Sequence, residues 1–286
     1  MIESSIKSYS AKKKQPALSR LPPWVWKATS GGETIWLIGC IHLGKEADTA
    51  IYPQYLQLVD SGAAIFFETI PGSTKQPDSQ RYISRQGYLP KGQTIKDVVS
   101  TDSWAEVNLK LSMEPDLFKQ ISPMVPWFAA LTVTSKGYEK IGLEQKYSLE
   151  SHILRSSVSL RIPVGGLESP IDQFSAIERM PKGDEEKMLI DSIREFQGGA
   201  RRTSSIHRAW IQGDRGAMQK AILAEPMDSA LHRNIIDRRN DVWIGKIIAA
   251  SQRYRNTIVV VGVEHLISET SNIPAMLRQR GFSVFP

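Results

Sequence analysis

One pattern occurs twice in the chain, and it constrains the fold more than any other feature of the sequence. Four apolar residues, a glycine, two further residues, a histidine and a leucine form "IWLIGCIHL" at 35–43 and "IVVVGVEHL" at 258–266. Short apolar runs of this length are typical of buried strands. Each glycine would let its strand bend, or let backbone approach a ligand closely, just before the histidine.

Two further apolar runs end in an acid instead of a histidine. "AAIFFE" ends at Glu68 and "IPVGGLE" ends at Glu168. Helical spacing separates three of the four runs from the next, as strand–helix–strand units require. The pattern therefore predicts an α/β fold, with a central, mostly parallel or mixed sheet flanked by helices and a largely helical middle region.

The remaining elements follow from apolar spacing and turn residues. Strands at 24–28 and 34–41 would form a hairpin around the Ser-Gly-Gly turn at 30–32, and "FSVFP" would be the last strand. The expected helices beyond the first strands are 47–61, several between 93 and 142, 148–160, 169–180, 184–197, 200–212, 215–224 and 229–250.

The four ionisable residues at the run ends are the candidate site. In open α/β sheets, ligands bind beyond the carboxyl ends of the strands, so His42, Glu68, Glu168 and His265 are expected to converge there. Imidazole and carboxylate groups are suitable ligands for Zn²⁺, Mn²⁺ or Co²⁺. Each residue also has a structural alternative. A strand-end histidine can be structural, Glu68 can cap a helix or face solvent, and Glu168 can interact with a helix dipole.

Two other features of the sequence have more than one interpretation. Arg239 and Asn240 belong to the charged run "DRRND" on the predicted helix 229–250, which would either face solvent or stabilise an oxyanion beside a metal. Cys40 is two residues from His42 and would be either a nucleophile or a buried small residue, and the buried residue is favoured.

Composition excludes several classes of protein. The net charge is +6, but residues 1–20 hold five basic residues against one acid, so the remainder is close to neutral. We therefore expect a basic, flexible segment at 1–21, a single domain at 22–286, and no nucleic-acid binding. No apolar run is long enough for a transmembrane segment. One cysteine allows no internal disulfide, and no signal peptide is visible, which fits a cytoplasmic protein or one whose leader is absent from this chain.

Taken together, the sequence resembles the TraB/GumN family, which is similar to the Tiki proteases and more distantly to the erythromycin-esterase/ChaN group. The resemblance rests on the two Gly-x-x-His stretches and on ordered elements that include "AAIFFET", "MVPWFAALTV", "RIPVGGLESPIDQFSAI" and "IIDRRNDVW". It implies that the family's two histidines, two acids and Arg-Asn pair correspond to His42, His265, Glu68, Glu168, Arg239 and Asn240. Two positions depart from the family pattern. Cys40 stands where threonine is usual, and Ser148-Leu149-Glu150 stands where a Gly-Leu/Ile-Asp is expected.

The resemblance implies a divalent-metal-dependent hydrolase, specifically a Tiki-like peptidase that acts on a peptide or other small substrate. His42, His265 and Glu68 would bind the cation, Glu168 would be a fourth ligand or the general base, and Arg239 with Asn240 would stabilise the oxyanion. Two alternatives remain open. The same site would serve a non-catalytic protein that sequesters a peptide signal or a haem-like ligand, or the protein would be an inactive structural homologue. Oligomeric state is not predicted.

Overall fold

The computed structural model describes residues 21–223 and 229–286, so the flexible segment predicted at 1–21 lies almost wholly outside the described residues. Six strands form one sheet in the order β4-β3-β5-β2-β1-β6. Their bounds are β1 Val25–Ser30, β2 Glu33–Cys40, β3 Ala64–Phe67, β4 Val164–Gly166, β5 Asn256–Gly262 and β6 Ser283–Phe285. The four strands β4, β3, β5 and β2 run parallel, whereas β1 and β6 are antiparallel. The predicted mixed sheet is confirmed.

The two repeated stretches form the centre of this sheet. β2 and β5 pair in parallel, with Gly39 opposite Val261 and Cys40 opposite Gly262. Both strands are almost entirely buried, which explains their runs of Ile, Leu and Val. Since β3 pairs with β5 on its other side, the carboxyl ends of β2, β5 and β3 meet at one edge.

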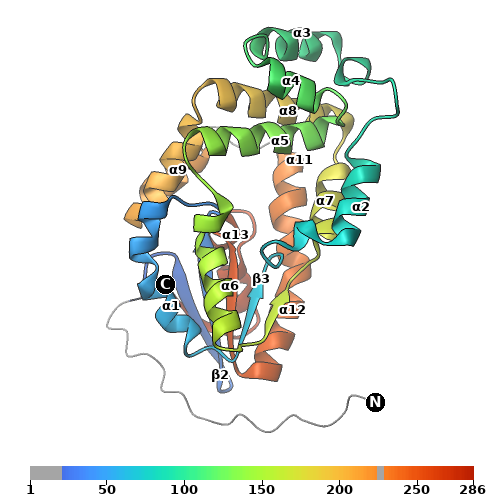
Figure 1. The fold of residues 1–286 in the computed structure, drawn as a ribbon. Coiled ribbons are helices and arrows are strands. Elements are labelled where there is room, and N and C mark those ends of the chain that lie inside the picture. Colours follow the sequence, from blue (N-terminus) through green and yellow to red (C-terminus); the bar gives the residue numbers. More distant parts are fainter. Residues whose placement is uncertain (1–20, 224–228) are drawn as a thin grey trace.

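Helices cover the sheet and form a separate group at one end of it (Figure 1). They are α1 Pro53–Val59, α2 Pro77–Gln86, α3 Thr101–Lys110, α4 Pro115–Ile121, α5 Pro126–Lys140, α6 Leu149–Ser159, α7 Pro170–Glu178, α8 Lys182–Gln197, α9 Arg201–Gln212, α10 Arg215–Leu223, α11 Ser229–His232, α12 Arg238–Tyr254, α13 Glu264–Ile267 and α14 Ile273–Gln279. α12 packs against β2 and β5, and α6 packs against α1.

The described residues form three apolar clusters, and two of them are large. One surrounds the sheet and includes Trp243, Trp210 and the valines of β5. The other lies among α3, α4, α5 and α8, away from the sheet, and contains Val133, Ile193 and their neighbours. Among the described residues, no helix has the length and apolar character needed to cross a membrane.

Three predicted elements differ in detail from the observed ones. The helix predicted at 47–61 is divided into a 3₁₀ turn, Glu46–Ile51, and α1, because Pro53 favours a new helix start. The helix predicted at 229–250 is interrupted by a π-helical segment, Arg233–Asp237, before α12. The run predicted at 161–168 contributes only the three residues of β4, an edge strand that is largely exposed.

Candidate metal centre

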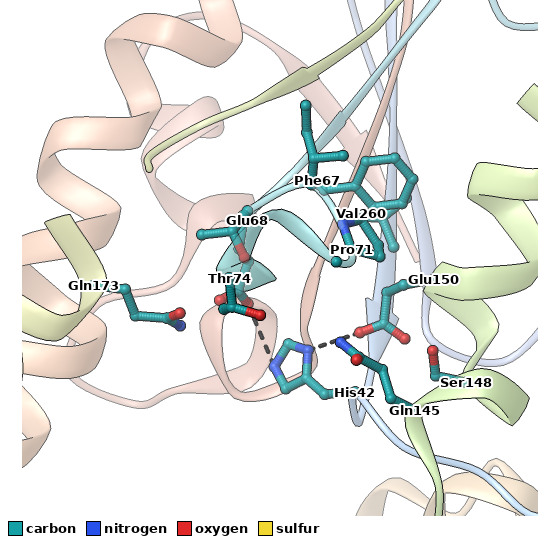
Figure 2. A pocket seen from close by; sticks show the side chains of 13 residues that line it. His42, Phe67, Glu68, Pro71, Thr74, Gln145, Ser148, Glu150, Gln173 and Val260 are labelled. Atoms are coloured by element: carbon teal, nitrogen blue, oxygen red, sulfur yellow. Dashed lines mark hydrogen bonds and ion pairs between the residues drawn. The ribbon is translucent and has the colours of Figure 1, made fainter. Parts of the chain in front are cut away.

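Three of the predicted residues converge at the carboxyl edge of the sheet. His42 lies two residues beyond β2, Glu68 follows β3 directly, and His265 lies in the one-turn helix α13 after β5. The Nε2 atoms of His42 and His265 lie 3.7 and 3.6 Å from the same atom, Glu68 Oε1. Figure 2 shows His42 beside Glu68 at the cavity wall. The two repeated stretches therefore bring both imidazoles to one carboxylate.

The opposite nitrogen of each imidazole is held by another residue. His42 Nδ1 lies 2.7 Å from Glu150 Oε1, and His265 Nδ1 lies 2.7 Å from Asn240 Oδ1. The Asn240 amide is oriented by its own Nδ2, which donates to the Ser271 carbonyl at 2.9 Å. Because an amide oxygen only accepts hydrogen bonds, the proton of neutral His265 is on Nδ1 and its Nε2 lone pair faces Glu68.

Gly262 leaves room between these groups. A Cβ at this position would lie 3.0 Å from His42 Nε2 and 3.1 Å from Glu68 Oε1. The Gly262 N–H also donates to Glu68 Oε1, which fixes that carboxylate against the end of β5. A side chain at position 262 would occupy the space that the three polar groups face, so the second glycine of the pattern has a local role in the site.

Arg239 joins the two acids that were predicted for the site. Its Nη2 lies 2.7 Å from Glu68 Oε2, and its Nε donates to Glu168 Oε1 at 3.0 Å. The other Glu168 oxygen accepts from Trp243 Nε1 at 3.0 Å. Arg239 Nη1 also lies 3.5 Å from His265 Nε2. Glu168 is thus separated from the histidines by the guanidinium, and both of its oxygens are engaged within the protein.

These contacts bear on the roles expected for Glu168, Arg239 and Asn240. None of the three lines the cavity that contains His42 and Glu68, and Glu168 and Arg239 border a different depression of the surface. Arg239 holds Glu68, and Asn240 holds His265. Direct roles as a ligand, a base or oxyanion donors stay predictions, whereas the contacts support positioning roles.

The pKa values of the two histidines move in opposite directions. Burial lowers the pKa of His265 to about 3, and nearby Arg239 adds to this effect. Burial also acts to lower the pKa of His42, but the carboxylates of Glu68 and Glu150 outweigh it and raise that pKa to about 9. In the cation-free protein His42 is therefore positively charged at neutral pH, whereas His265 is neutral.

The pKa values of two of the three acids are lowered because positively charged groups lie beside them. Burial acts to raise the pKa of Glu68, but Arg239 and the two histidines hold it well below its usual range. For Glu150, burial is likewise outweighed, by the hydrogen bond and charge of His42, so its pKa is lowered. Burial raises the pKa of Glu168 despite the opposing effect of Arg239.

Glu150 was not among the predicted site residues. It lies in the first turn of α6, where neither strand periodicity nor a Gly-x-x-His pattern marks it. The only signal was that Ser148-Leu149-Glu150 departs from the family pattern while keeping an acid. Cys40 is buried, as expected, and its Sγ lies 2.9 Å from Glu150 Oε1. Cys40, His42 and Glu150 offer ligand atoms within 4.8 Å of one another, which makes them a possible metal site.

A cavity of about 200 Å³ has His42, Glu68 and Glu150 in its wall (Figure 2). Besides His42, Glu68 and Glu150, it is lined by uncharged polar side chains that include Thr74, Gln145 and Gln173. A larger groove of about 800 Å³ shares Pro71, Gly72 and Gln145 with this cavity. A second, larger depression therefore lies next to the candidate metal centre.

Comparisons with known proteins identify the family of this chain. The family model described as the TraB/PrgY/gumN family matches residues 24–286. Uncharacterized protein YbaP of Escherichia coli (strain K12) is 22% identical over 273 residues, which cover 89% of this chain and 97% of that protein. The YbaP protein of Shigella flexneri matches with the same identity and coverage. No solved structure shows a significant match.

Proposed function

The chain belongs to the TraB/PrgY/gumN family, and we propose that it is a divalent-metal-dependent hydrolase, most closely a Tiki-like peptidase. One observation supports this proposal above the others. The Nε2 atoms of His42 and His265 face a single oxygen of Glu68, while each Nδ1 atom has a hydrogen-bond partner elsewhere in the chain. Histidines that bind metals are commonly oriented in this way, by a carboxylate or carbonyl oxygen on the other ring nitrogen.

The donor set fits a cation such as Mn²⁺, Co²⁺ or Zn²⁺. His42 Nε2, His265 Nε2 and Glu68 Oε1 would be the ligands, and Gly262 leaves the space between them free of side-chain atoms. A cation held by these groups would supply Lewis acidity, lowering the pKa of water and polarising a carbonyl group. To bind it, His42 must lose the ring proton on Nε2. The proton that stays on Nδ1 is donated in a hydrogen bond to Glu150 Oε1.

Several residues would act through the ligands. Arg239 fixes Glu68 and supplies positive charge beside it, and Glu168 with Trp243 fixes Arg239. Asn240 keeps His265 in the tautomer that presents Nε2. In this proposal Glu168 and Asn240 are positioning residues, because their polar atoms are already engaged with other residues of the chain.

The shape of the cavity favours an extended substrate such as a peptide. The space beside His42 and Glu68 is small, but Pro71 and Gly72 line both this space and the larger groove. Thr74, Gln145 and Gln173 carry hydrogen-bonding groups without charge, which suit the amides of a peptide backbone. A peptide end would lie near the histidines, with the rest of the chain in the groove.

Turnover of a peptide library by purified protein, with and without added Mn²⁺, tests the proposal. We expect cleavage that depends on the cation and that His42→Ala and His265→Ala each abolish. Gly262→Ala should weaken Mn²⁺ binding because its methyl group enters the space between the ligands. Gly245→Ala is a matched control, since nothing lies within 4 Å of a Cβ at that helical position.

Two results would contradict the proposal. If both histidine variants bind Mn²⁺ or Zn²⁺ as tightly as the wild type, the metal centre is elsewhere or absent. If peptides bind tightly but are never cleaved in the presence of any of the three cations, the protein is a binding protein and not a hydrolase.

A further inference from the structure

We propose that Cys40, His42 and Glu150 form a second cation site, on the Nδ1 side of His42, that takes a thiophilic divalent cation such as Zn²⁺ or Cd²⁺. This site goes beyond the proposed hydrolytic centre, because it uses neither Glu68 nor His265. It also uses the one residue of the first Gly-x-x-His stretch that departs from the family pattern, Cys40.

The three donor groups come from two segments that are far apart in the sequence, the end of β2 with the loop after it and the start of α6. Cys40 is the last residue of β2, and Glu150 is in the first turn of α6. Cys40 Sγ lies 2.9 Å from Glu150 Oε1 and 3.9 Å from His42 Nδ1, and the latter atom lies 2.7 Å from Glu150 Oε1. One atom from each residue thus lies within 4.8 Å of the others, as the ligands of one small cation must.

A second observation points independently to a ligand at this place. Glu150 is only 7% exposed, and its Oε2 has no hydrogen-bond partner among the residues that the structure describes. A buried carboxylate oxygen without a partner is costly, so such atoms are rare unless an ion or water satisfies them. Glu150 also lines the cavity, and the side chain of His42 beside it is 56% exposed, so an ion has access.

The ligand types decide which cation is preferred. A thiolate with imidazole and carboxylate favours Zn²⁺ or Cd²⁺ over Mn²⁺, which prefers oxygen ligands. On binding, the Cys40 thiol and the Nδ1–H of His42 would each release a proton to solvent, and Sγ and Nδ1 would then bind the cation. His42 would present the lone pair of Nδ1 and keep its remaining proton on Nε2, the atom that faces Glu68.

The two sites therefore compete for one imidazole ring. A cation at the proposed hydrolytic centre needs the Nε2 lone pair of His42 and leaves a proton on Nδ1. A cation on Cys40 and Glu150 needs the opposite arrangement. It follows that a thiophilic cation would inhibit any activity that depends on the Nε2 site.

A titration of purified full-length protein with Cd²⁺, followed by ultraviolet absorption, tests this second site. Cys40 is the only cysteine of the chain, so a sulfur-to-cadmium charge-transfer band can arise from no other residue. We expect a band that saturates at about one Cd²⁺ per chain. Cys40→Ser should remove it, and Glu150→Gln should weaken Cd²⁺ binding by about tenfold or more, whereas His265→Ala should keep the band.

Circular dichroism would show that Cys40→Ser is folded, and the Glu150→Gln variant tests the site without changing the thiol. The absence of a band in folded wild-type protein would overturn the inference, as would Cd²⁺ binding of equal strength in Glu150→Gln. Either result would leave Mn²⁺ binding at His42 Nε2 and His265 untouched, so this failure is distinguishable from failure of the proposed hydrolase.

Discussion

The two Gly-x-x-His segments share a sequence pattern and an edge of the sheet, yet their histidines lie in opposite surroundings. The His42 side chain is 56% exposed, and its backbone is left-handed, with φ at 62°. His265 is 3% exposed, lies in α13, and packs against the Trp243 ring at 4.5 Å. The partner of His42 is a carboxylate, and the partner of His265 is an amide.

This difference shows that the pattern determines where an imidazole is placed but not how it is charged. The carboxylate partners raise the pKa of His42 to about 9, while burial beside Arg239 lowers that of His265 to about 3. One histidine is a fixed, neutral part of the protein interior. The other lines the cavity and is exposed to solvent.

The largest expected difference between the two histidines is in stability. His265→Ala should lower the free energy of unfolding by about 2–3 kcal/mol, because it creates a buried gap and leaves Asn240 Oδ1 without its donor. His42→Ala should cost less, about 1–2 kcal/mol, because the side chain is mostly in solvent, although the buried Glu150 carboxylate loses its partner. Chemical denaturation of both variants in metal-free buffer would measure this. Equal losses would show that the two segments are not as different as their burial indicates.

The next largest effect is on Mn²⁺ affinity, when the hydrogen-bond partner of either Nδ1 atom is changed. Asn240→Ala should weaken Mn²⁺ binding by about 10- to 100-fold, since the ring of His265 loses the bond that sets its tautomer. Glu150→Gln should have a smaller effect, of about tenfold or less, because the glutamine oxygen can still accept from His42 Nδ1. Isothermal titration calorimetry would measure both affinities.

Asn234→Ala is a suitable control for the Asn240 variant. Asn234 is also buried, and its side chain accepts from Arg238, not from a histidine. If Asn234→Ala weakens Mn²⁺ binding as much as Asn240→Ala does, the effect comes from general disturbance of this helical region and not from His265.

The smallest expected effect is on the pH dependence of stability in metal-free protein. The raised pKa of His42 contributes stability that is complete below its ordinary pKa of about 6.5 and is lost as pH rises through 9. The lowered pKa of His265 contributes stability above about pH 6.5 that is lost as pH falls towards 3. The exposed position of His42 limits its contribution to about 1 kcal/mol.

Denaturation of the wild type and His42→Gln from pH 6 to pH 10 would measure the first contribution. We expect the advantage of the wild type to shrink as pH rises. An advantage that stays constant between about pH 7 and pH 10 would show that His42 is neutral in the folded, metal-free protein, like His265.

Much of the fold and part of the site could be predicted from the sequence. The apolar runs identified β2, β3 and β5, and the rule that parallel strands end at one edge brought His42, Glu68 and His265 together. These contacts depend on backbone topology, which short-range patterns reveal. The run before Glu168 forms a shorter and more exposed strand than its pattern predicts. It is an edge strand, and its two glycines offer little apolar surface.

The residues behind the ligands could not be predicted in the same way. Glu150 reaches His42 from α6, and Asn240 reaches His265 from α12, across more than twenty residues of sequence in each case. Which side chain of the run at 237–241 faces inward depends on the π-helical segment before α12, which shifts the helical phase. No local spacing in the sequence marks that shift.

Anomalous diffraction from crystals grown with Mn²⁺ tests the central claim most directly, because it locates the cation relative to both histidines. We expect one strong peak about 2.0–2.3 Å from His42 Nε2, His265 Nε2 and a Glu68 oxygen. A peak only on the Nδ1 side of His42, or no peak at the carboxyl edge of the sheet, would contradict it.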